Sequence, residues 1–422
     1  MYRLAAELFP ICRSITGDGV RQSLSILREI IPLELIETPT GAQALDWTIP
    51  DEWNIRDAYI IDPSGRKIAD FKVSNLHVLN YSAPIRARVD LEELRAHLHT
   101  LPERPHAIPY RTSYFKRDWG FCLPDRVARA LPEGDYEVCV DSTLAPGALT
   151  YGELFIPGAE DGEVLFSAHV CHPSLANDNL SAMVVATHLA ARLLKKQTRL
   201  SYRFLFAPGT IGALAWLERN RDRLDRLQGG LVLNCLGDQG EFTYKRTFAG
   251  DNYIDRAVEC ALQADPGATV EDFIPYGYDE RQYNAPGFRA PVGAFSRTTW
   301  GRYPEYHTSD DNLDLIQPDK LEQSLDKLTE IVDILERNRI VRSLSPYGEP
   351  QLGRRGLYDQ AGGARPKAFQ TAVLWVLSMA DGAADLMAVA RRSGLPFTLV
   401  ADAADALAEA SLVAGTPAIA SH

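Results

Sequence analysis

Apolar runs and amphipathic stretches alternate along the middle of the chain, between about residues 151 and 338. Short continuous apolar runs are typical of buried strands, and apolar residues that recur every three or four positions are typical of helices. Their alternation predicts an α/β fold, a doubly wound sheet with helices on both faces. The predicted strands are 152–156, 164–168, 202–207, 231–235 and 292–296, and the predicted helices are 180–194, 212–224, 252–264 and 320–336.

Two regions before this core differ from it in the spacing of their apolar residues and in their aromatic and proline content. Residues 1–45 indicate helices, most clearly at 19–31, where leucines and isoleucines recur at helical spacing after a glycine-rich turn. Residues 46–144 are richer in aromatic residues and are interrupted by prolines, which is typical of short strands. We therefore predict that the first segment packs on a core at 145–340 and that the second forms an inserted β-rich subdomain. Its strand-like segments are 53–61, 78–85 and 136–140.

The chain after the Pro/Gly-rich connector at 345–350 predicts a separate α-helical unit, 345–422. Its helices are expected at 369–379, 383–392 and 399–412, and the turn between the last two resembles a helix-turn-helix. The unit holds six Lys/Arg against seven Asp/Glu, and its last predicted helix has no Lys or Arg. Because a DNA-reading helix needs cations, we expect packing or protein contact here and no nucleic-acid binding.

Composition narrows the functional classes. The chain has 422 residues, 45% of them hydrophobic and 24% charged, which fits a globular protein of two or three domains. A net charge of -12 argues against binding to nucleic acid or an anionic membrane. The first ten residues are broken by charge and proline, so they resemble neither a secretory signal nor a membrane span. Six cysteines without CxxC spacing indicate reduced thiols, and we expect a cytoplasmic protein.

The most informative chemistry lies directly after the predicted strand 164–168. His169, His172 and Asp178 follow within a short turn, and ligands of doubly wound folds collect at this end of the strands. A histidine far downstream, His307, completes a set of imidazoles and a carboxylate. Catalytic zinc takes three such protein ligands and keeps one position open for water. The four residues therefore predict a zinc site.

Strand geometry limits which histidines can share one metal. His169 would lie on a strand and His172 at the start of a turn, so we expect only one of them to reach the same metal as Asp178, and the other to orient a ligand or contact substrate. Asp178 also lies where a helix N-cap belongs. Structural histidines beside a capping Asp178 are the alternative. Cys171 is expected to be a small buried residue rather than a catalytic thiol.

A hydrolase of this type also needs a general acid or base. Asp279 and Glu280 lie in a polar loop between prolines, together with Tyr278 and Gln282 as candidate substrate contacts. Glu305, two residues before His307, is the other candidate. A solvated loop charge is the alternative for either glutamate.

Further polar residues lie where predicted strands end. Arg297 could clamp a substrate carboxylate, and Asp238, near Asn234, could donate a carboxylate to the same sheet edge. The acidic run 310–314 is expected to contain turn caps and one residue that hydrogen-bonds His307. In the insertion, the aromatic and cationic segment 110–120 is suited to lining a cleft or forming a solvent-facing hairpin.

These residues carry a resemblance to the bacterial aminopeptidase-like family. Its members combine a zinc-aminopeptidase-like domain, whose sheet is mixed, with an inserted β-rich domain and a C-terminal winged-helix domain, and the match covers nearly the whole chain. More distantly, the core is similar to co-catalytic zinc aminopeptidases and glutaminyl cyclases. The motifs that carry the resemblance are at 169–173, 176–179, 208–212, 278–282, 305–309 and 348–353.

The resemblance implies roles for single residues. His169 matches the histidine at the end of the metal-site strand, Asp178 the metal-bridging aspartate and His307 the late histidine ligand. Where the distant aminopeptidases have paired glutamates, one a base and one a ligand, this chain has Gly209 and Thr210, which can replace neither. Either one zinc ion served by a glutamate from another loop, or a divergent activity, has to be considered beside the two-zinc arrangement.

The expected function is a metal-dependent, aminopeptidase-like hydrolase that cleaves an amide bond with a zinc-activated water. Its partner would be a peptide or small amide substrate, and one zinc ion or two would be the cofactor. Asp279, Glu280 or Glu305 could bind a substrate ammonium. Two alternatives stay open: an amidohydrolase or acyl-transferring enzyme acting on a small metabolite or sugar precursor, and a noncatalytic binding protein with this fold. A homo-oligomer is also open.

Overall fold

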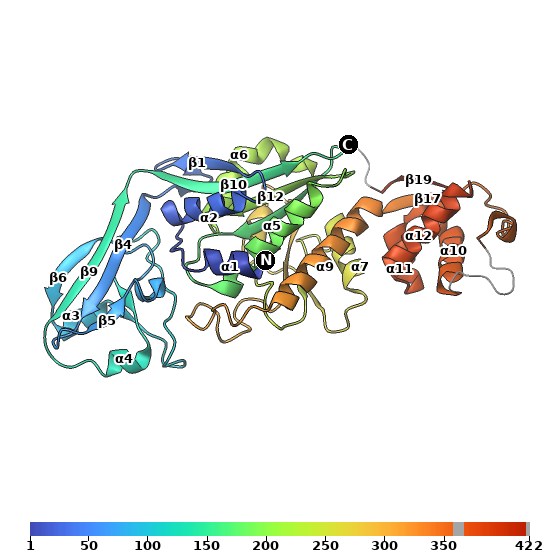
Figure 1. Cartoon of the computed structure of the whole chain (residues 1–422). Helices are drawn as coiled ribbons and strands as arrows, with labels where there is room; N and C mark the ends of the chain where they lie inside the picture. The colour runs from blue at the N-terminus through green and yellow to red at the C-terminus, as the bar shows by residue number, and fades with distance from the viewer. Residues whose placement is uncertain (358–366, 419–422) are drawn as a thin grey trace.

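The computed structural model describes residues 1–357 and 367–418. Figure 1 shows a central α/β body with a β-rich unit at one end and a C-terminal unit at the other. Within the described ranges, no helix combines the length and apolar character needed to cross a bilayer.

The central sheet has eight strands in the order β1-β10-β12-β11-β13-β16-β14-β15. Its four middle strands run parallel, whereas β1, β10 and β14 run antiparallel to neighbours. All five predicted core strands are present. The strands are β1 (Glu34–Pro39), β10 (Ala148–Ile156), β11 (Glu163–His169), β12 (Ser201–Ala207), β13 (Leu227–Leu233), β14 (Thr243–Lys245), β15 (Thr269–Glu271) and β16 (Val292–Ser296).

Helices cover both faces of this sheet, as the doubly wound pattern predicts. Along β11, Val164 and Phe166 belong to one hydrophobic cluster and Leu165 to another, because successive side chains of a strand point to opposite faces. The first cluster is completed by α1 (Tyr2–Leu8), α2 (Asp18–Arg28), α5 (Ala182–Leu193), α7 (Tyr253–Leu262) and α9 (Pro318–Arg337), and the second by α6 (Ile211–Asn220) and α8 (Glu280–Tyr283).

The N-terminal segment departs from the all-helical prediction for residues 1–45. After α1 and α2 the chain forms β1, which pairs with β10 at the sheet edge. Only Ile36 is buried along β1, so the segment shows no apolar alternation that could have predicted a strand.

The insertion is built on two long strands that lead out of the core. Its sheet has the order β5-β4-β9-β6, and its own hydrophobic cluster includes Ile60 and Val138. The predicted strand at 78–85 is wrong: Tyr81 has a φ of 73°, which a strand does not allow, and β6 begins at Ile85. The elements are β2 (Gln43–Ala44), β3 (Trp47–Thr48), β4 (Glu52–Ile61), β5 (Lys67–Asp70), β6 (Ile85–Val89), α3 (Leu91–Ala96), β7 (Leu98–His99), β8 (Phe121–Cys122), α4 (Asp125–Arg129) and β9 (Tyr136–Ala145).

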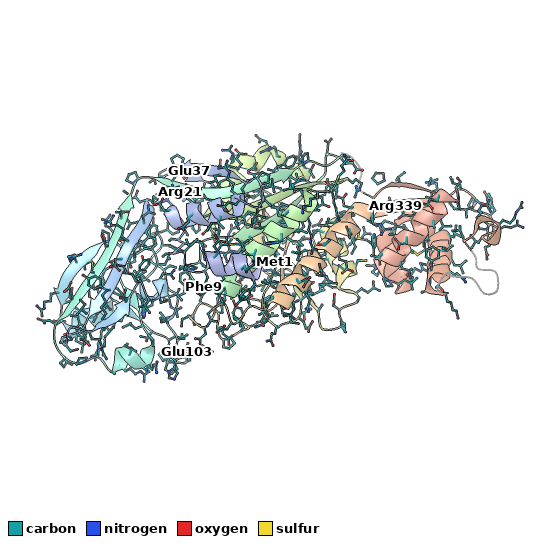
Figure 2. The ribbon with its side chains drawn as sticks, in the orientation of Figure 1. Met1, Phe9, Arg21, Glu37, Glu103 and Arg339 are labelled. Carbon is teal, nitrogen blue, oxygen red and sulfur yellow. The ribbon has the colours of Figure 1, made fainter. Side chains whose placement is uncertain are left out.

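An ion-pair network holds the junction of the insertion and the core. Arg21 of α2 donates to Glu37 of β1 at 2.8 Å, and Figure 2 shows these two side chains together beside the departing strands. Arg21 also forms two hydrogen bonds with Glu52 of β4, at 2.6 and 2.7 Å. These bonds hold the pKa of Glu52 at about 2. One arginine thus ties a core helix, a core strand and the first long strand of the insertion.

The C-terminal unit contains the three predicted helices and three strands that were not predicted. β17 lies between β18 and β19 in an antiparallel sheet. β18 and β19 have small, mostly exposed residues, so no apolar pattern marked them. The elements are β17 (Arg339–Ser343), α10 (Lys367–Met379), β18 (Asp381–Asp385), α11 (Leu386–Ser393), α12 (Phe397–Glu409) and β19 (Val413–Pro417).

Acidic residues of α12 face the core. Arg337 contacts Asp402 and Asp405 at 2.7 Å, and Arg339 contacts Asp405 at 2.5 Å. α12 itself contains no Lys or Arg. Asp402 and Asp405 of this helix therefore form ion pairs with the end of α9 and with β17.

Candidate metal centre

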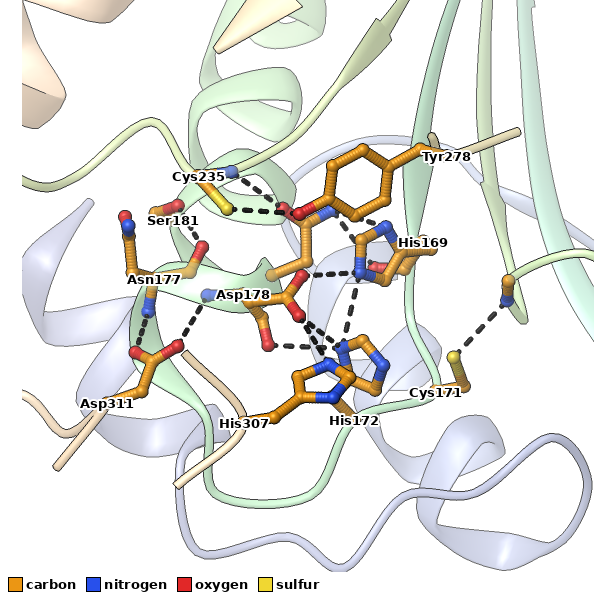
Figure 3. A network of polar contacts seen from close by, with 12 residues as sticks. His169, Cys171, His172, Asn177, Asp178, Ser181, Cys235, Tyr278, His307 and Asp311 are labelled. Atoms are coloured by element: carbon orange, nitrogen blue, oxygen red, sulfur yellow. Dashed lines mark hydrogen bonds and ion pairs between the residues drawn. The ribbon is translucent and has the colours of Figure 1, made fainter. Parts of the chain in front are cut away.

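His169 and Asp178 meet at the carboxyl end of β11. His169 is the last residue of the strand, and Asp178 lies in the π-helical turn Ala176–Ser181 that precedes α5. The Nε2 atom of His169 lies 2.8 Å from Oδ1 of Asp178, whose side chain is fully buried (Figure 3). The carboxylate therefore faces imidazole and does not cap the helix.

His172 reaches the same carboxylate. Its Nδ1 atom is 3.2 Å from Oδ2 of Asp178 and 3.3 Å from Nε2 of His169. Both histidines therefore lie beside Asp178, and which of them would share a metal with it stays a prediction. The strand ends at His169, so the alternation of side chains along a strand does not extend to His172.

His307 closes the group from the loop after β16. Its Nε2 atom lies 3.0 Å from Oδ2 of Asp178. The ring stacks on Tyr306 with 3.9 Å between centroids, and the carbonyl of His307 accepts a 2.8 Å hydrogen bond from the Tyr110 N–H. Residues of the insertion and of the core thus hold this imidazole together.

The charges of the group are mutually stabilising. Burial opposes the negative charge of Asp178, but His172 and His169 hold the pKa of its carboxyl well below its usual range. Burial likewise opposes protonation of His172, and Asp178 nevertheless raises the pKa of that imidazole. The pKa of His307 is lowered by its burial. One carboxylate surrounded by three imidazoles attracts a cation.

The donor atoms fit a zinc ion. The ligand atoms of His169, His172 and Asp178 all lie within 4.8 Å of one another. Neighbouring donors are 2.8–3.3 Å apart, and the ligand atoms of a tetrahedral zinc lie roughly 3.3 Å apart. Imidazole and carboxylate are ligands that zinc accepts. Among residues 1–357 and 367–418, this is the group of His, Cys, Asp and Glu donors close enough to hold an ion.

Asp311 and Asn179 hold these donors in place. Oδ1 and Oδ2 of Asp311 accept hydrogen bonds from the backbone N–H groups of Asn177 and Asp178, at 2.6 and 3.1 Å. The Asn179 amide lies 3.2 Å from the other ring nitrogen of His169 and accepts a bond from the Cys235 N–H. The acidic run was expected to supply a partner for His307, but Asp311 bonds the backbone beside Asp178, and His307 bonds Asp178 itself.

A cavity of about 260 Å³ opens over this group and is called here the histidine cavity. His169 and His172 line it together with Asp279, whose Oδ1 accepts a 2.7 Å hydrogen bond from the Thr210 N–H. Burial raises the pKa of the Asp279 carboxyl. Asp279 is thus the carboxylate of the polar loop that shares a cavity with the imidazoles.

Gly209 and Cys171 lie beside the same cavity. A Cβ at Gly209 would lie 3.5 Å from Sγ of Cys171 and 3.7 Å from Cβ of His169, so this position faces the histidines without a side chain of its own. The Cys171 thiol accepts a hydrogen bond from the Gly209 N–H, and burial raises its pKa to about 12. A protonated, buried thiol agrees with the structural role predicted for Cys171.

Three other predicted residues lie elsewhere. Glu280 is fully buried and pairs with Lys245 in a second cavity. Arg297 is buried and donates to Gly240, Gln323 and Ser324, so it braces the core. Asp238 accepts bonds from Asn177 and Thr298, one layer behind the imidazoles.

Of the remaining predicted residues, Glu305, Gln282 and Tyr278, only Tyr278 lines the histidine cavity. Glu305 is half-buried, and its backbone carbonyl accepts bonds from Thr308. Gln282 lies on α8, and the residues that line the histidine cavity do not include it. Tyr278 stacks on His169 with 5.4 Å between ring centroids and lines that cavity.

The insertion forms part of the wall. Tyr114 and Phe115 line the histidine cavity, and the ring of Tyr110 contacts the edges of His172 and His307 at 5.2 and 5.0 Å. Of the two alternatives left open for the segment 110–120, a cleft lining and a solvent-facing hairpin, its aromatic residues Tyr114 and Phe115 follow the first. Its cations Lys116 and Arg117 are exposed.

Known families and proteins match nearly the whole chain. A family described as a domain of unknown function (DUF4910) matches residues 2–338, and a winged helix-turn-helix family matches residues 339–415. A Clostridium acetobutylicum protein, provisionally named a polysaccharide biosynthesis protein with an aminopeptidase-like domain, is 46% identical over 415 residues, 98% of this chain and 95% of the relative.

Solved structures agree with this assignment. A crystal structure of a Clostridium acetobutylicum protein, provisionally described as a peptidase, superposes with a TM-score of 0.94 at 45% identity, covering 98% of this chain and 96% of the other. The zinc aminopeptidase BSAP from Bacillus subtilis superposes with a TM-score of 0.57 at 15% identity, covering 78% and 93%, so it shares the fold. The chain therefore belongs to the DUF4910 family of aminopeptidase-like proteins and carries a C-terminal winged helix-turn-helix domain.

Proposed function

We propose that this protein is a metal-dependent hydrolase that cleaves an amide bond. The observation that carries the proposal is the convergence of His169, His172 and His307 on the buried carboxylate of Asp178. Zinc is the proposed cofactor, held by Asp178 and by imidazole nitrogens of this group. When bound, zinc lowers the pKa of a coordinated water and polarises a carbonyl oxygen.

Asp279 is the proposed general base. It lies in the same cavity as His169 and His172, and one of its oxygens is anchored by the Thr210 N–H. The other oxygen is left to accept a proton from water and to return it to the leaving amine. A raised pKa suits this role, because a carboxyl that titrates nearer neutral pH both accepts and donates a proton readily.

This assignment accounts for the glycine at position 209. Distant aminopeptidases have paired glutamates at positions 209 and 210, whereas this chain has glycine and threonine there. The carboxylate that we propose comes instead from the neighbouring loop, and it is bonded to the backbone of Thr210 itself. Glu305 remains the second candidate for this role because of its place two residues before His307.

The proposed substrate is a small amide bound between aromatic side chains. Tyr114, Phe115 and Tyr278 line the histidine cavity, whose volume of about 260 Å³ is slightly below the roughly 300–1,000 Å³ of sites for drug-sized ligands. The relative named for polysaccharide biosynthesis and the absence of the paired glutamates favour an amidohydrolase acting on an acylated sugar precursor as the second candidate.

A substrate panel tests the proposal. The protein as purified is incubated with aminoacyl amides, dipeptides and N-acylated amino sugars, and released amine is measured with and without a chelator. We expect turnover of at least one class, loss of turnover with chelator and recovery with added zinc. Bound zinc without turnover of any substrate class would overturn the hydrolase proposal and would favour a noncatalytic binding protein with this fold.

A further inference from the structure

A second cavity lies behind Tyr278 and shares that side chain with the histidine cavity. It has a volume of about 210 Å³ and is called here the Asn234 cavity. His169, His172 and Asp178 are not among the residues that line it. Asp279 faces the histidine cavity and Glu280 faces the Asn234 cavity, so the loop before α8 separates the two.

The amide of Asn234 has no hydrogen-bond partner in the part of the chain that the structure describes. Asn234 follows β13 and is fully buried, yet neither its Nδ2 nor its Oδ1 forms a hydrogen bond with the described residues. The buried hydroxyl oxygen of Thr299 also lacks a partner among them. Buried polar groups are nearly always hydrogen-bonded, and an unsatisfied one costs about 1–3 kcal/mol. The amide NH2 and carbonyl oxygen of Asn234 and the Thr299 hydroxyl, which can both donate and accept, are therefore available to a ligand.

The charged groups of the cavity cancel one another. Lys245 pairs with Glu280, and Arg302 pairs with Glu271 at 2.5 Å. Lys245 additionally donates to the carbonyl of Tyr276 at 2.9 Å. Two cations and two carboxylates, already paired, leave no net charge for an ionic ligand. The cavity favours a neutral ligand with several hydrogen-bonding groups.

Two aromatic rings stand at the cavity. The rings of Tyr276 and Trp300 contact each other edge to face, with 4.9 Å between centroids, and Tyr276 is 62% exposed. Such rings present flat apolar faces beside the polar groups of Asn234 and Thr299. A ligand that fits both features has an apolar face and hydroxyl groups at its rim, and each hydroxyl can donate and accept a hydrogen bond.

We propose that the Asn234 cavity binds a neutral sugar ring, stacked on Trp300 or Tyr276 and hydrogen-bonded to Asn234 and Thr299. The cavity is smaller than the roughly 300–1,000 Å³ of sites for drug-sized ligands, which suits a single ring. Because Tyr278 borders both cavities, a sugar bound here can present a substituent to the histidine cavity. Sugar binding itself requires neither the metal nor the hydrolase activity.

Calorimetric titration tests this site. Glucose, galactose and N-acetylglucosamine are titrated into the wild-type protein, with leucine and inorganic phosphate as comparison ligands. We expect saturable binding of at least one sugar, at least tenfold weaker in Trp300→Ala and in the nearly isosteric Thr299→Val. Tyr347→Ala, which removes an aromatic ring that is 96% exposed elsewhere, serves as the matched control and should bind like wild type.

Three results would overturn the proposal: no saturable binding of any of the three sugars, sugar binding that neither Trp300→Ala nor Thr299→Val weakens, or binding of leucine or phosphate in place of sugar. His307→Ala separates this proposal from the hydrolase proposal. We expect this variant to lose metal and to keep wild-type sugar affinity, so each proposal can fail alone.

Discussion

The histidine cavity and the Asn234 cavity lie on two sides of Tyr278 and present different chemical groups to a ligand. At the first, three imidazoles converge on one carboxylate, and backbone bonds to Asp311 hold that carboxylate in position. At the second, opposite charges are already paired, whereas the neutral amide of Asn234 is without a partner among the described residues. The first arrangement attracts a cation and the second a neutral polar ligand. Unpaired hydrogen-bonding groups and unpaired charge are thus separate indications of function.

The strongest way to sharpen this comparison is to remove the carboxylates of the two candidate bases one at a time, beginning with Asp279. Asp279→Asn should lower turnover about 10²–10⁴-fold because it removes the proposed proton acceptor of the histidine cavity. Zinc content should not change, since Asp279 contacts the Thr210 backbone and not the imidazoles. Steady-state kinetics and elemental analysis of the same preparation measure both quantities.

Glu305→Gln is the matched control for this substitution. It removes the carboxylate of the second candidate base, which the proposed proton transfer through Asp279 does not use, so turnover should fall less than tenfold. A larger loss in Glu305→Gln than in Asp279→Asn would transfer the role of base to Glu305.

A change at Asp311 tests how the carboxylate of the histidine cavity is supported. Burial raises the pKa of Asp311 to about 7, so the folded state holds this proton more tightly than the unfolded state. Its contribution to the free energy of unfolding is therefore complete below about pH 4 and declines as the pH rises towards 7. Asn does not titrate, so the stability lost in Asp311→Asn should shrink by about 1 kcal/mol or more over that interval.

Urea unfolding of both proteins between pH 4 and 7 measures this difference. Ser309→Ala, in the same loop, is a suitable control because its hydroxyl does not titrate in this range. A stability difference between wild type and Asp311→Asn that stays constant or grows with pH would contradict the assignment.

The last comparison is between two glycines beside the cavities, and the smallest effect is expected at Gly209. A Cβ at Gly277, whose φ is 157°, would overlap the buried Lys245–Glu280 pair, so Gly277→Ala should cost about 1–3 kcal/mol of unfolding free energy. A Cβ at Gly209 would make only ordinary contacts, so Gly209→Ala should change stability by less than about 1 kcal/mol. Thermal and urea unfolding of the two variants measure these losses of unfolding free energy. Equal losses in Gly277→Ala and Gly209→Ala would contradict the open space inferred at Gly209.

Patterns in the chain predicted the core and the residues that meet in the candidate metal centre. Continuous apolar runs marked the parallel strands, and a strand end followed by polar residues marked His169 and Asp178. β1 was missed because only one of its six residues is buried, so its sequence shows no apolar alternation. β18 and β19 were missed because most of their residues are small and only one in each strand is buried. Burial patterns therefore predict the interior of a sheet better than its edges.

The contacts within the site depend on the directions of side chains, which the spacing of residues along the sequence does not determine. Asp279 and Glu280 are adjacent, yet the start of α8 turns them into different cavities. Asp311 acts through backbone N–H groups more than 130 positions away in the sequence, and no motif marks such a bond. His172 lies close to Asp178 because it belongs to the turn after β11, where the side-chain alternation of a strand no longer applies.

The most direct test of the account is the zinc content of the purified protein, measured by elemental mass spectrometry on wild type, Asp178→Ala, His307→Ala and the control His106→Ala, whose histidine is exposed in the insertion. The account predicts about one zinc per chain in wild type and His106→Ala, and its loss in Asp178→Ala and His307→Ala. No zinc in wild type after reconstitution, or equal zinc in all four proteins, would contradict it.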